Sequence, residues 1–478
     1  MPFPFTLPTT SSISFPDFFS SSTHPSLPLT ATSRRAVLRS ALKSHKRLPS
    51  SSRASNLPSI LAALNDYIPY LFALDAGVSG IPVAGEEIDV VLVKELQVEW
   101  RVVLSATTPG RESPRVKLKS LDSEVFFVLS TLGYTYCLLA RAQLHTLALQ
   151  NASSTSTEQR AGAIAGAMKN LIAANSVFTY LVARSQHNQP PASVPDISQA
   201  VLSGLASMTL AEATLITVLK DDPYPAVVSE QRNKESKDWM FKNPDIPKVR
   251  AHLFARLCLA AAEHASRAQG MLGNGGGTKV DADLLEYCDD LKRTAKAKAC
   301  RFFGIDTELE GKTGEGIAWL RGAKKELGFT GGSDEDKRKF GAFSKLKKDW
   351  AEKREDKRIE KGGEWGGDAG RFEEGRVIEM LEKKWVKEND TVNVQLIPQY
   401  EPLVANMPSG REYHTPKPYQ APTLDEDIIA QMRAPPDPND IAYQTVDDDS
   451  DAEESQSEPV GAFPGTKDQY SASTSSYY

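Results

Sequence analysis

The sequence predicts a mainly α-helical protein with a small antiparallel β-sheet near its N-terminus and a disordered acidic tail at its C-terminus. Three observations support this prediction. Six long segments between residues 121 and 327 carry apolar residues at helical spacing, with short loops between them. Upstream, Val98, Trp100 and Val102 alternate with other residues, as in a half-buried strand. Between residues 423 and 458, 12 acidic residues stand against a single basic one, a composition that cannot form a core.

Length and composition exclude several classes of protein. The chain has 478 residues and a formal net charge of −6, which argues against a protein that coats nucleic acid. Its 4 cysteines show no CxxC spacing, so neither a disulfide scaffold nor a zinc ribbon is expected. The first 33 residues lack Lys and Arg, so we expect no secretory signal. Val201–Leu219 is the most membrane-like stretch, but its Glu212 favours a buried helix.

The N-terminal part of the chain is predicted to hold the β-structure and the first helix. Residues 1–35 alternate apolar and polar residues between prolines, which favours extended chain over helix. Residues 56–76 have helical spacing, although Pro69 should kink or split that helix. The turn TTPGRESP then separates the strand within 88–104 from a partner strand at 115–121.

From residue 121 onward the spacing is helical, and prolines and glycines mark the loops. Lys337–Lys361 has 11 basic and 5 acidic residues, which predicts an exposed charged insertion at 330–370 that is partly helical or disordered. An amphipathic helix at Gly370–Glu388 and irregular proline-rich chain follow, and disorder is predicted from about residue 436. The six predicted helices are Leu121–Leu149, Arg160–Arg184, Asp196–Lys220, Lys248–Met271, Asp281–Phe303 and Gly314–Leu327.

Signals for enzymatic chemistry are weak. The GKT motif at 311–313 resembles the end of a phosphate-binding loop, but Asp306 stands where that loop needs its first glycine. No two of the 7 histidines are four residues apart, the spacing that places a metal-binding pair on one helix face. Cys258 and His264 are six residues apart on one predicted helix, so they do not face each other as nucleophile and base. We therefore predict no catalytic residue, no metal site and no cofactor.

Five basic residues in the charged insertion are candidate contacts with an anionic membrane. Clustered cations attract anionic lipid headgroups, and binding of this kind weakens as salt is added. The alternative is a solvated insertion without a ligand, which is the more common role of a charge run. The candidate residues are Lys345, Lys347, Lys348, Lys353 and Arg354.

Five segments, in order along the chain, resemble the BRO domain proteins of the ALIX and rhophilin type. Residues 121–140 (LDSEVFFVLSTLGYTYCLLA) are similar to the family's L-x-F-E-K-A-x-V-L-F-N-I-G-A helix, with Ser130-Thr131 in place of the usual Phe-Asn. Residues 387–398 (KENDTVNVQLIP) are similar to its N-D-x-I-Y-x-x-x-V-P segment, with Asn393 where a tyrosine often stands. The other three are Val98-Glu99-Trp100, 208–220 (MTLAEATLITVLK) and 314–327 (GEGIAWLRGAKKEL).

The resemblance extends to a subfamily and implies a fold. The opening PFPFTLP and the stretches 64–75 (LNDYIPYLFALD) and 408–419 (PSGREYHTPKPY) are similar to fungal regulators of the response to alkaline ambient pH. The family fold implied is a curved, boomerang-like helical solenoid with a TPR-like core and a small N-terminal sheet. The domains implied are a BRO domain at 1–420 (β-ribbon and first helices 1–120, long-helix core 121–329, insertion 330–370, terminal helix and wrapping segment 371–420) and a disordered tail at 421–478.

The resemblance also implies a function, because BRO domains bind partners rather than catalyse reactions. The partner implied is the amphipathic C-terminal helix of the core ESCRT-III subunit, bound on an exposed apolar patch. In alkaline-pH signalling such an adaptor would promote cleavage of the transcription factor PacC by a complex that includes a calpain-like protease. The expected location is the cytoplasm, with recruitment to ESCRT sites at the plasma membrane or endosomes, and nucleic acid is not an expected partner. The alternative is a general ESCRT or membrane-surface scaffold that acts through the basic insertion.

Carried over onto this sequence, the apolar patch comprises Leu253 and Leu257, with Thr217 and Leu219 from a second helix. The two leucines are one turn apart, so they share a helix face. Thr217 departs from the large apolar residue of ALIX. The alternative is that both leucines belong to the core, as leucines at helical spacing usually do. Phe254 and Cys258 lie on the adjacent apolar face, which we expect to point to the core.

Overall fold

The structure is a computed structural model that describes residues 2–106, 113–149, 156–187, 194–232, 246–274, 279–329 and 365–435. The chain divides into a compact unit, Met1–Arg433, and a second unit, Ala434–Tyr478. The elements below belong to the first unit. Most of the turn at 107–114 and of the GNGGG loop, the charged insertion up to residue 364, and the tail from residue 436 lie outside the described residues.

Two small antiparallel sheets lie in the N-terminal part of the first unit, where one was predicted. Strand β3 (Gln97–Arg101) pairs with β4 (Arg115–Lys119), and Trp100 lies opposite Val116. The predicted alternation is confirmed, because Val98 and Trp100 are buried while the residues between them are not. A second pair joins β1 (Phe19–Ser20) and β2 (Val91–Leu92).

The first two helices correct two predictions. Helix α1 (Leu27–Arg47) begins inside the segment 1–35 that was predicted to be extended throughout. Pro28 lies in its first turn, where a missing N–H breaks no intrahelical hydrogen bond, so this proline starts the helix instead of preventing it. Helix α2 (Ser50–Val78) continues through Pro69, so of the two outcomes predicted there, a kink or a split, the split is wrong. Its buried side chains, such as Leu64 and Leu71, offset the hydrogen bond lost at the proline.

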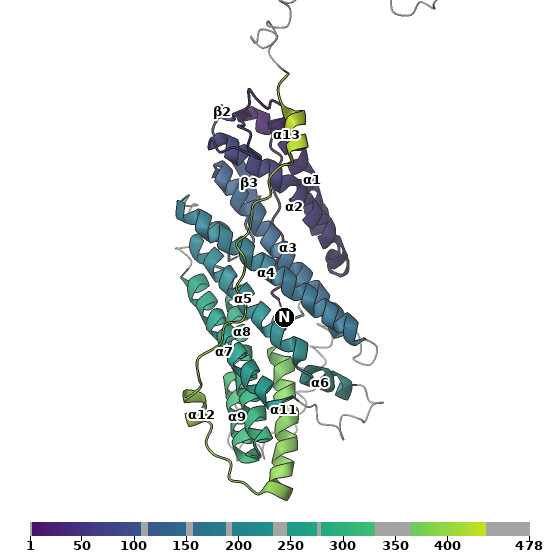
Figure 1. The fold of residues 1–478 in the computed structure, drawn as a ribbon, viewed down its shortest axis with the longest axis vertical. Coiled ribbons are helices and arrows are strands. Elements are labelled where there is room, and N and C mark those ends of the chain that lie inside the picture. Colours follow the sequence, from purple (N-terminus) through teal and green to yellow (C-terminus); the bar gives the residue numbers. More distant parts are fainter. Residues whose placement is uncertain are drawn as a thin grey trace, which may run out of the picture. The chain divides into compact units, whose positions relative to one another are not determined.

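The helical core is confirmed: each of the six predicted helices is present, with bounds within three residues of the prediction except at the end of α8, which runs to Leu309 instead of Phe303. Consecutive long helices pack side by side through the first unit, which is the solenoid arrangement predicted (Figure 1). Helix α11 (Arg371–Glu388) was also predicted, whereas the short helices α6 (Tyr224–Arg232), α12 (Glu401–Ala405) and α13 (Glu426–Met432) were not. The six are α3 (Leu121–Leu149), α4 (Thr157–His187), α5 (Gln199–Asp221), α7 (Lys248–Gly273), α8 (Ala282–Leu309) and α9 (Thr313–Glu326).

A buried carboxylate joins the N-terminal elements to the helical core. Glu124, at the start of α3, accepts hydrogen bonds from Arg35 of α1 (2.7 Å), Trp100 of β3 (2.6 Å) and Tyr67 of α2 (3.1 Å). The Trp100 indole also stacks on Phe127, with ring centroids 5.3 Å apart. Because a buried charge is stable only when it is paired and hydrogen-bonded, this cluster fixes how the first helices and the sheet meet α3.

A second buried ionic cluster lies in the C-terminal half of the core. Arg301 of α8 is fully buried and donates to Asp222, just after α5 (2.6 Å), and to Glu374 of α11 (2.5 Å). Lys298 also contacts Glu374, at 2.6 Å. Burial alone would raise the pKa of the Glu374 carboxyl, but the charges of Arg301 and Lys298 lower it. The cluster therefore links three helices through ionised side chains.

Three helices, α2, α3 and α5, are long and apolar enough to cross a membrane by length and composition alone. In this structure 56%, 78% and 78% of their most apolar windows are buried against other parts of the protein. Packing therefore accounts for their hydrophobicity, as predicted for the helix that contains Glu212.

Candidate partner-binding site

The structure brings the two predicted binding segments together, because α5 and α7 pack against each other. Leu253 is partly buried at the margin of the C-terminal hydrophobic cluster, and Thr217 and Leu219 are also partly buried. Leu257 is only 2% exposed and belongs to that cluster, together with Phe254 and Cys258. Of the two leucines, Leu253 is therefore the one that a partner can reach without displacing core residues. Whether the four residues bind a partner remains a prediction.

An extended segment of the chain crosses these helices, and we call residues 406–419 the strap. On α7 the Arg411 N–H donates to the Arg256 carbonyl (3.0 Å), and the Arg256 guanidinium donates to the Ser409 carbonyl (3.2 Å). The Gly410 N–H donates to Glu263 (3.3 Å). The strap then reaches α5 and continues past α4 toward α13 (Figure 1). This stretch belongs to the wrapping segment that the resemblance implied within 371–420, but its contacts with α5 and α7 could not be predicted, because it has no helical or strand periodicity.

Two histidines complete the attachment of the strap. The buried His264 of α7 lies 2.8 Å from the Glu412 carboxylate. His414 of the strap places Nε2 2.8 Å from the Thr217 hydroxyl and 3.4 Å from the Ala213 carbonyl. Burial lowers the pKa of His414. Thr217, one of the predicted site residues, thus holds the strap through its hydroxyl group.

Gly410 lies so close to α7 that no larger residue fits there. A Cβ atom at this position would lie 2.5 Å from the backbone nitrogen of Ala260 and 2.7 Å from its Cα. The neighbouring atoms belong to the backbone of a packed helix and cannot move aside cheaply. The glycine therefore permits the close approach of strap and helix.

Replacing Gly410 with alanine should detach the centre of the strap from α7, because the new methyl group overlaps the helix backbone. We expect faster amide hydrogen exchange and faster proteolysis around Arg411 in this variant. The matched control is Gly270→Ala on α7, where a Cβ meets no atom within 4 Å and helix propensity improves. Equal exchange rates in the two variants would contradict the predicted role of Gly410.

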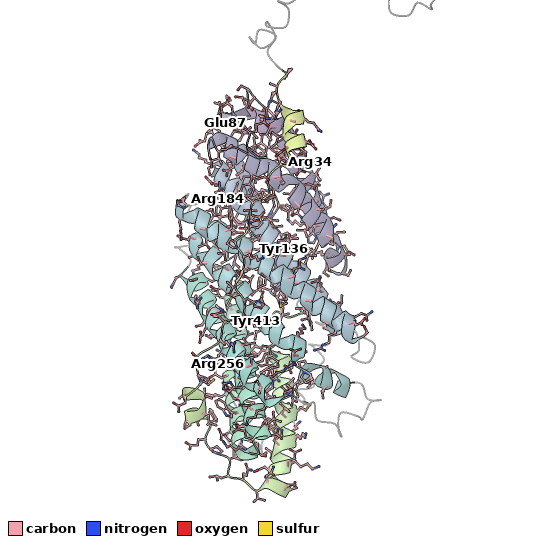
Figure 2. The ribbon with its side chains drawn as sticks, in the orientation of Figure 1. Arg34, Glu87, Tyr136, Arg184, Arg256 and Tyr413 are labelled. Carbon is pink, nitrogen blue, oxygen red and sulfur yellow. The ribbon has the colours of Figure 1, made fainter. Side chains whose placement is uncertain are left out.

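The accessible surface next to the strap includes an aromatic side chain that the sequence analysis missed. Tyr413 is 59% exposed and makes an edge contact with His414. Figure 2 shows Tyr413 and Arg256 along the same side of the first unit. Met407 of the strap packs on the same hydrophobic cluster as Leu253. The candidate site is therefore a composite of α5, α7 and the strap, with Tyr413 as an exposed aromatic anchor of the kind enriched at interfaces.

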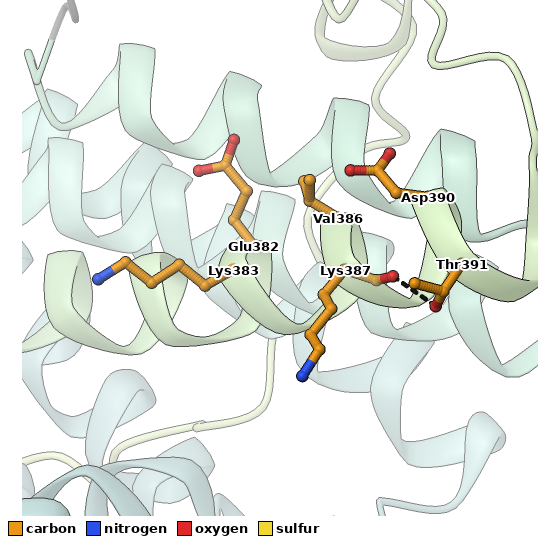
Figure 3. Close-up of a pocket in the computed structure, with 6 residues that line it drawn as sticks. All are labelled: Glu382, Lys383, Val386, Lys387, Asp390 and Thr391. Carbon is orange, nitrogen blue, oxygen red and sulfur yellow. Dashed lines mark hydrogen bonds between the residues drawn. The ribbon is translucent and has the colours of Figure 1, made fainter.

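Other parts of the described structure offer less to a ligand. A shallow groove runs along α11 and is lined by Glu382, Lys383, Val386, Lys387, Asp390 and Thr391 (Figure 3). It contains none of the predicted binding residues. Within the described ranges, no three His, Cys, Asp or Glu side chains gather as a metal site would need. The five basic residues predicted to contact membranes (Lys345, Lys347, Lys348, Lys353 and Arg354) lie outside the described part of the chain.

Comparison with known proteins finds a matching family, a similar sequence and similar structures. The BRO1-like domain family matches residues 38–410. The pH-response regulator protein palC of Emericella nidulans is 44% identical over 504 aligned positions, which cover 98% of this chain and 99% of that protein. ALIX in complex with the SIVmac239 PYKEVTEDL late domain is similar in structure, with a TM-score of 0.52, 14% identity, and coverage of 88% of this chain and 49% of ALIX. An ALIX BRO1 domain in complex with CHMP4C gives a TM-score of 0.48, 14% identity and coverage of 90% and 97%.

Proposed function

Because this chain belongs to the BRO1-like domain family, we propose that it is a non-catalytic adaptor that regulates the response to ambient pH. The 44% identity to a pH-response regulator over nearly the whole of both chains supports the pathway. The partner proposed is the C-terminal amphipathic helix of the core ESCRT-III subunit. Recruitment of the adaptor to ESCRT sites would promote cleavage of PacC by a complex containing a calpain-like protease.

The observation that carries the proposal is the composite surface of α5, α7 and the strap. An amphipathic helix binds by laying its apolar stripe on apolar side chains that a polar rim surrounds. Leu253 and Leu219 supply partly buried apolar area, and Tyr413 supplies an exposed aromatic ring. Arg256 and Glu412 supply charges of both signs beside them. Since the strap is already hydrogen-bonded to α7, the surface is ordered before a partner arrives, which lowers the entropic cost of binding.

Leu253→Asp should abolish binding of a peptide that contains the partner's C-terminal helix, because a carboxylate would be desolvated without a partner at the contact. Isothermal calorimetry with the full-length protein measures the affinity, and we expect a loss of at least about 100-fold, the effect of removing a hot spot. Tyr413→Ala should weaken binding by about tenfold. Circular dichroism should show an unchanged helical content in both variants.

The controls separate a binding defect from a folding defect. Val37→Asp changes a 54% exposed valine on α1, away from α5 and α7, and should leave the affinity unchanged. Leu257→Asp changes a 2% exposed core residue and should lower stability instead of acting on binding alone. An absence of peptide binding by the unmodified protein, or full binding by Leu253→Asp, would contradict the proposal.

A further inference from the structure

Helix α1 and the chain on either side of it carry positive charge without negative charge. Residues 18–65 contain no Asp or Glu, but they contain seven Lys or Arg residues. One of the seven, Arg35, is neutralised by the buried Glu124. Because a run of like charge is most often only solvated, the positions and partners of the other side chains decide whether a binding site is present.

Four of these cations form a row along one side of α1. Arg35, Arg39, Lys43 and Arg47 follow one another at intervals of four residues. Residues at this interval are neighbours on the surface of a helix. The guanidinium of Arg35 lies 5.9 Å from the centroid of the Trp100 ring on β3. The row therefore begins beside the β3–β4 hairpin and continues along α1, which lies next to α2 in Figure 1.

The hairpin contributes another cation to this row. Arg115 begins β4 and is paired with Arg101 in the register of the hairpin. Desolvation lowers the pKa of Lys43. Neighbouring positive charges lower the pKa further, and they belong to Arg39, Arg115 and Arg47. Lys43 is therefore the centre of a group of like charges from two elements, and we call the four residues Arg39, Lys43, Arg47 and Arg115 the cationic cluster.

Nothing in the described part of the chain neutralises the cationic cluster. None of its four members is paired with a described carboxylate. The Nε atom of Arg39 is buried and has no hydrogen-bond partner among the described residues. A buried N–H group without an acceptor is unfavourable, and so is the repulsion between neighbouring cations. An anion bound beside Lys43 would relieve both.

The density of positive charge indicates which anion fits. A phosphoryl group on a side chain has a charge of about −1.5 to −2 and three acceptor oxygens, whereas a carboxylate has a single charge. Arginine guanidinium groups offer paired N–H donors that match phosphoryl oxygens, and arginine clusters recognise phosphorylated peptides. Successive cations of the row are about 6 Å apart along the helix axis. Alternate residues of an extended peptide are about 6.6 Å apart, so two phosphorylated residues at this spacing match the row.

The position of the cationic cluster favours a peptide over a membrane. Arg39 and Lys43 are half-buried, whereas Ala36, Val37 and Ser40 are exposed on the outer side of α1. The two cations therefore lie on the side of the helix that faces the hairpin, below its outermost residues. A flat layer of lipid headgroups would meet these outermost residues first, while an extended peptide can lie along the helix and reach the cations.

We propose that the cationic cluster binds an extended segment of a partner protein that carries two phosphorylated serine or threonine residues. Phosphoryl oxygens would accept hydrogen bonds from Lys43 and from the arginines around it, including the unsatisfied Nε–H of Arg39. Phosphorylation of the partner would then control the interaction. The site lies on α1 and β4, so it is independent of the surface of α5, α7 and the strap.

The test uses the full-length protein and three labelled glycine-rich peptides that differ only at two alternate positions, occupied by phosphoserine, by glutamate or by serine. Fluorescence anisotropy should show binding of the phosphoserine peptide, at least about tenfold weaker binding of the glutamate peptide, and none of the serine peptide. Added salt should weaken the binding. The double variant Arg39→Gln, Lys43→Gln should weaken binding of the phosphoserine peptide at least about tenfold, with an unchanged circular dichroism spectrum.

The matched control is the double variant Arg34→Gln, Lys325→Gln, which removes the same charge from exposed positions on α1 and α9 and should bind normally. The proposal is overturned if the phosphoserine peptide does not bind, if the glutamate or serine peptide binds equally well, or if the two double variants bind alike. Binding to phosphatidylcholine vesicles that contain phosphatidylinositol bisphosphate, lost in the Arg39→Gln, Lys43→Gln variant, would also overturn it in favour of a membrane.

Discussion

Arg301→Met should lower the free energy of unfolding by about 3–5 kcal/mol, the cost of breaking a buried ion pair by removing one partner. The variant leaves the Asp222 carboxylate, which is 2% exposed, without its cation, and leaves Glu374 with Lys298 alone. Both carboxylates are nearly fully buried, so water cannot replace the lost cation in the folded protein. Urea denaturation followed by circular dichroism measures the change.

The matched control for this prediction lies on the same helix. Arg293 of α8 contacts Asp289 at 2.6 Å, but its side chain is 40% exposed. Because exposed i,i+4 pairs contribute about 0.3–0.5 kcal/mol, Arg293→Met should change stability by less than about 1 kcal/mol. An equal loss of unfolding free energy in the two variants would contradict the prediction that the buried Arg301 cluster stabilises the fold more than an exposed ion pair does.

Glu212→Gln should raise the stability of the protein at pH 8 and leave it nearly unchanged at pH 4. Glu212 of α5 accepts hydrogen bonds on Oε1 from Tyr287 (2.5 Å) and from the Phe3 N–H (3.2 Å), while its Oε2 has no partner among the described residues. Burial raises its pKa to about 7, although the Tyr287 bond acts in the opposite direction. The folded protein therefore holds a proton that the unfolded chain releases near its ordinary pKa of 4.5.

The sign of the pH dependence follows from this raised pKa. Below about pH 4.5 the carboxyl is protonated in both states and carries no penalty. As the pH rises from there to about 7, the unfolded state gains stability by ionising, so folding loses up to about 3 kcal/mol. Glutamine has nearly the same shape as a protonated glutamate and does not ionise. The Glu212→Gln variant should therefore not lose this stability as the pH rises. Glu87→Gln, at an exposed position, should keep the pH dependence of the unmodified protein, and a Glu212→Gln variant that also kept it would contradict the prediction.

The helical core could be predicted because its signal is local. Apolar residues at helical spacing specify one buried face, and α3 was placed at its observed bounds, Leu121–Leu149. Helix α1 was missed because Pro25 and Pro28 are typical of extended chain. The residues that make this segment a helix, such as the buried Leu38, come later in the sequence. Local pattern alone does not distinguish a proline that begins a helix from one that prevents it.

The candidate site could be predicted only in part, because exposure depends on contacts between distant segments. Spacing placed Leu253 and Leu257 on one face of α7, but it could not show that only Leu253 is accessible. The strap forms part of this surface and covers part of α5 and α7. Its hydrogen bond between His414 and Thr217 joins residues 197 positions apart. The loop after α11 likewise depends on the hydrogen bonds between Gln395 and the start of α9.

The strap has a consequence for the order in which the chain folds. Its contact between Glu412 and His264 joins residues 148 positions apart, and beyond the strap Arg433, at the end of α13, pairs with Glu86 across 347 positions. Closing such long loops costs more conformational entropy than pairing neighbouring helices, so the helices should assemble first and the strap should dock last. During synthesis, the first and last helices can be held together only after residue 433 has left the ribosome. A chain interrupted before the strap should keep its helices but expose the parts of α5 and α7 that the strap contacts in the complete protein.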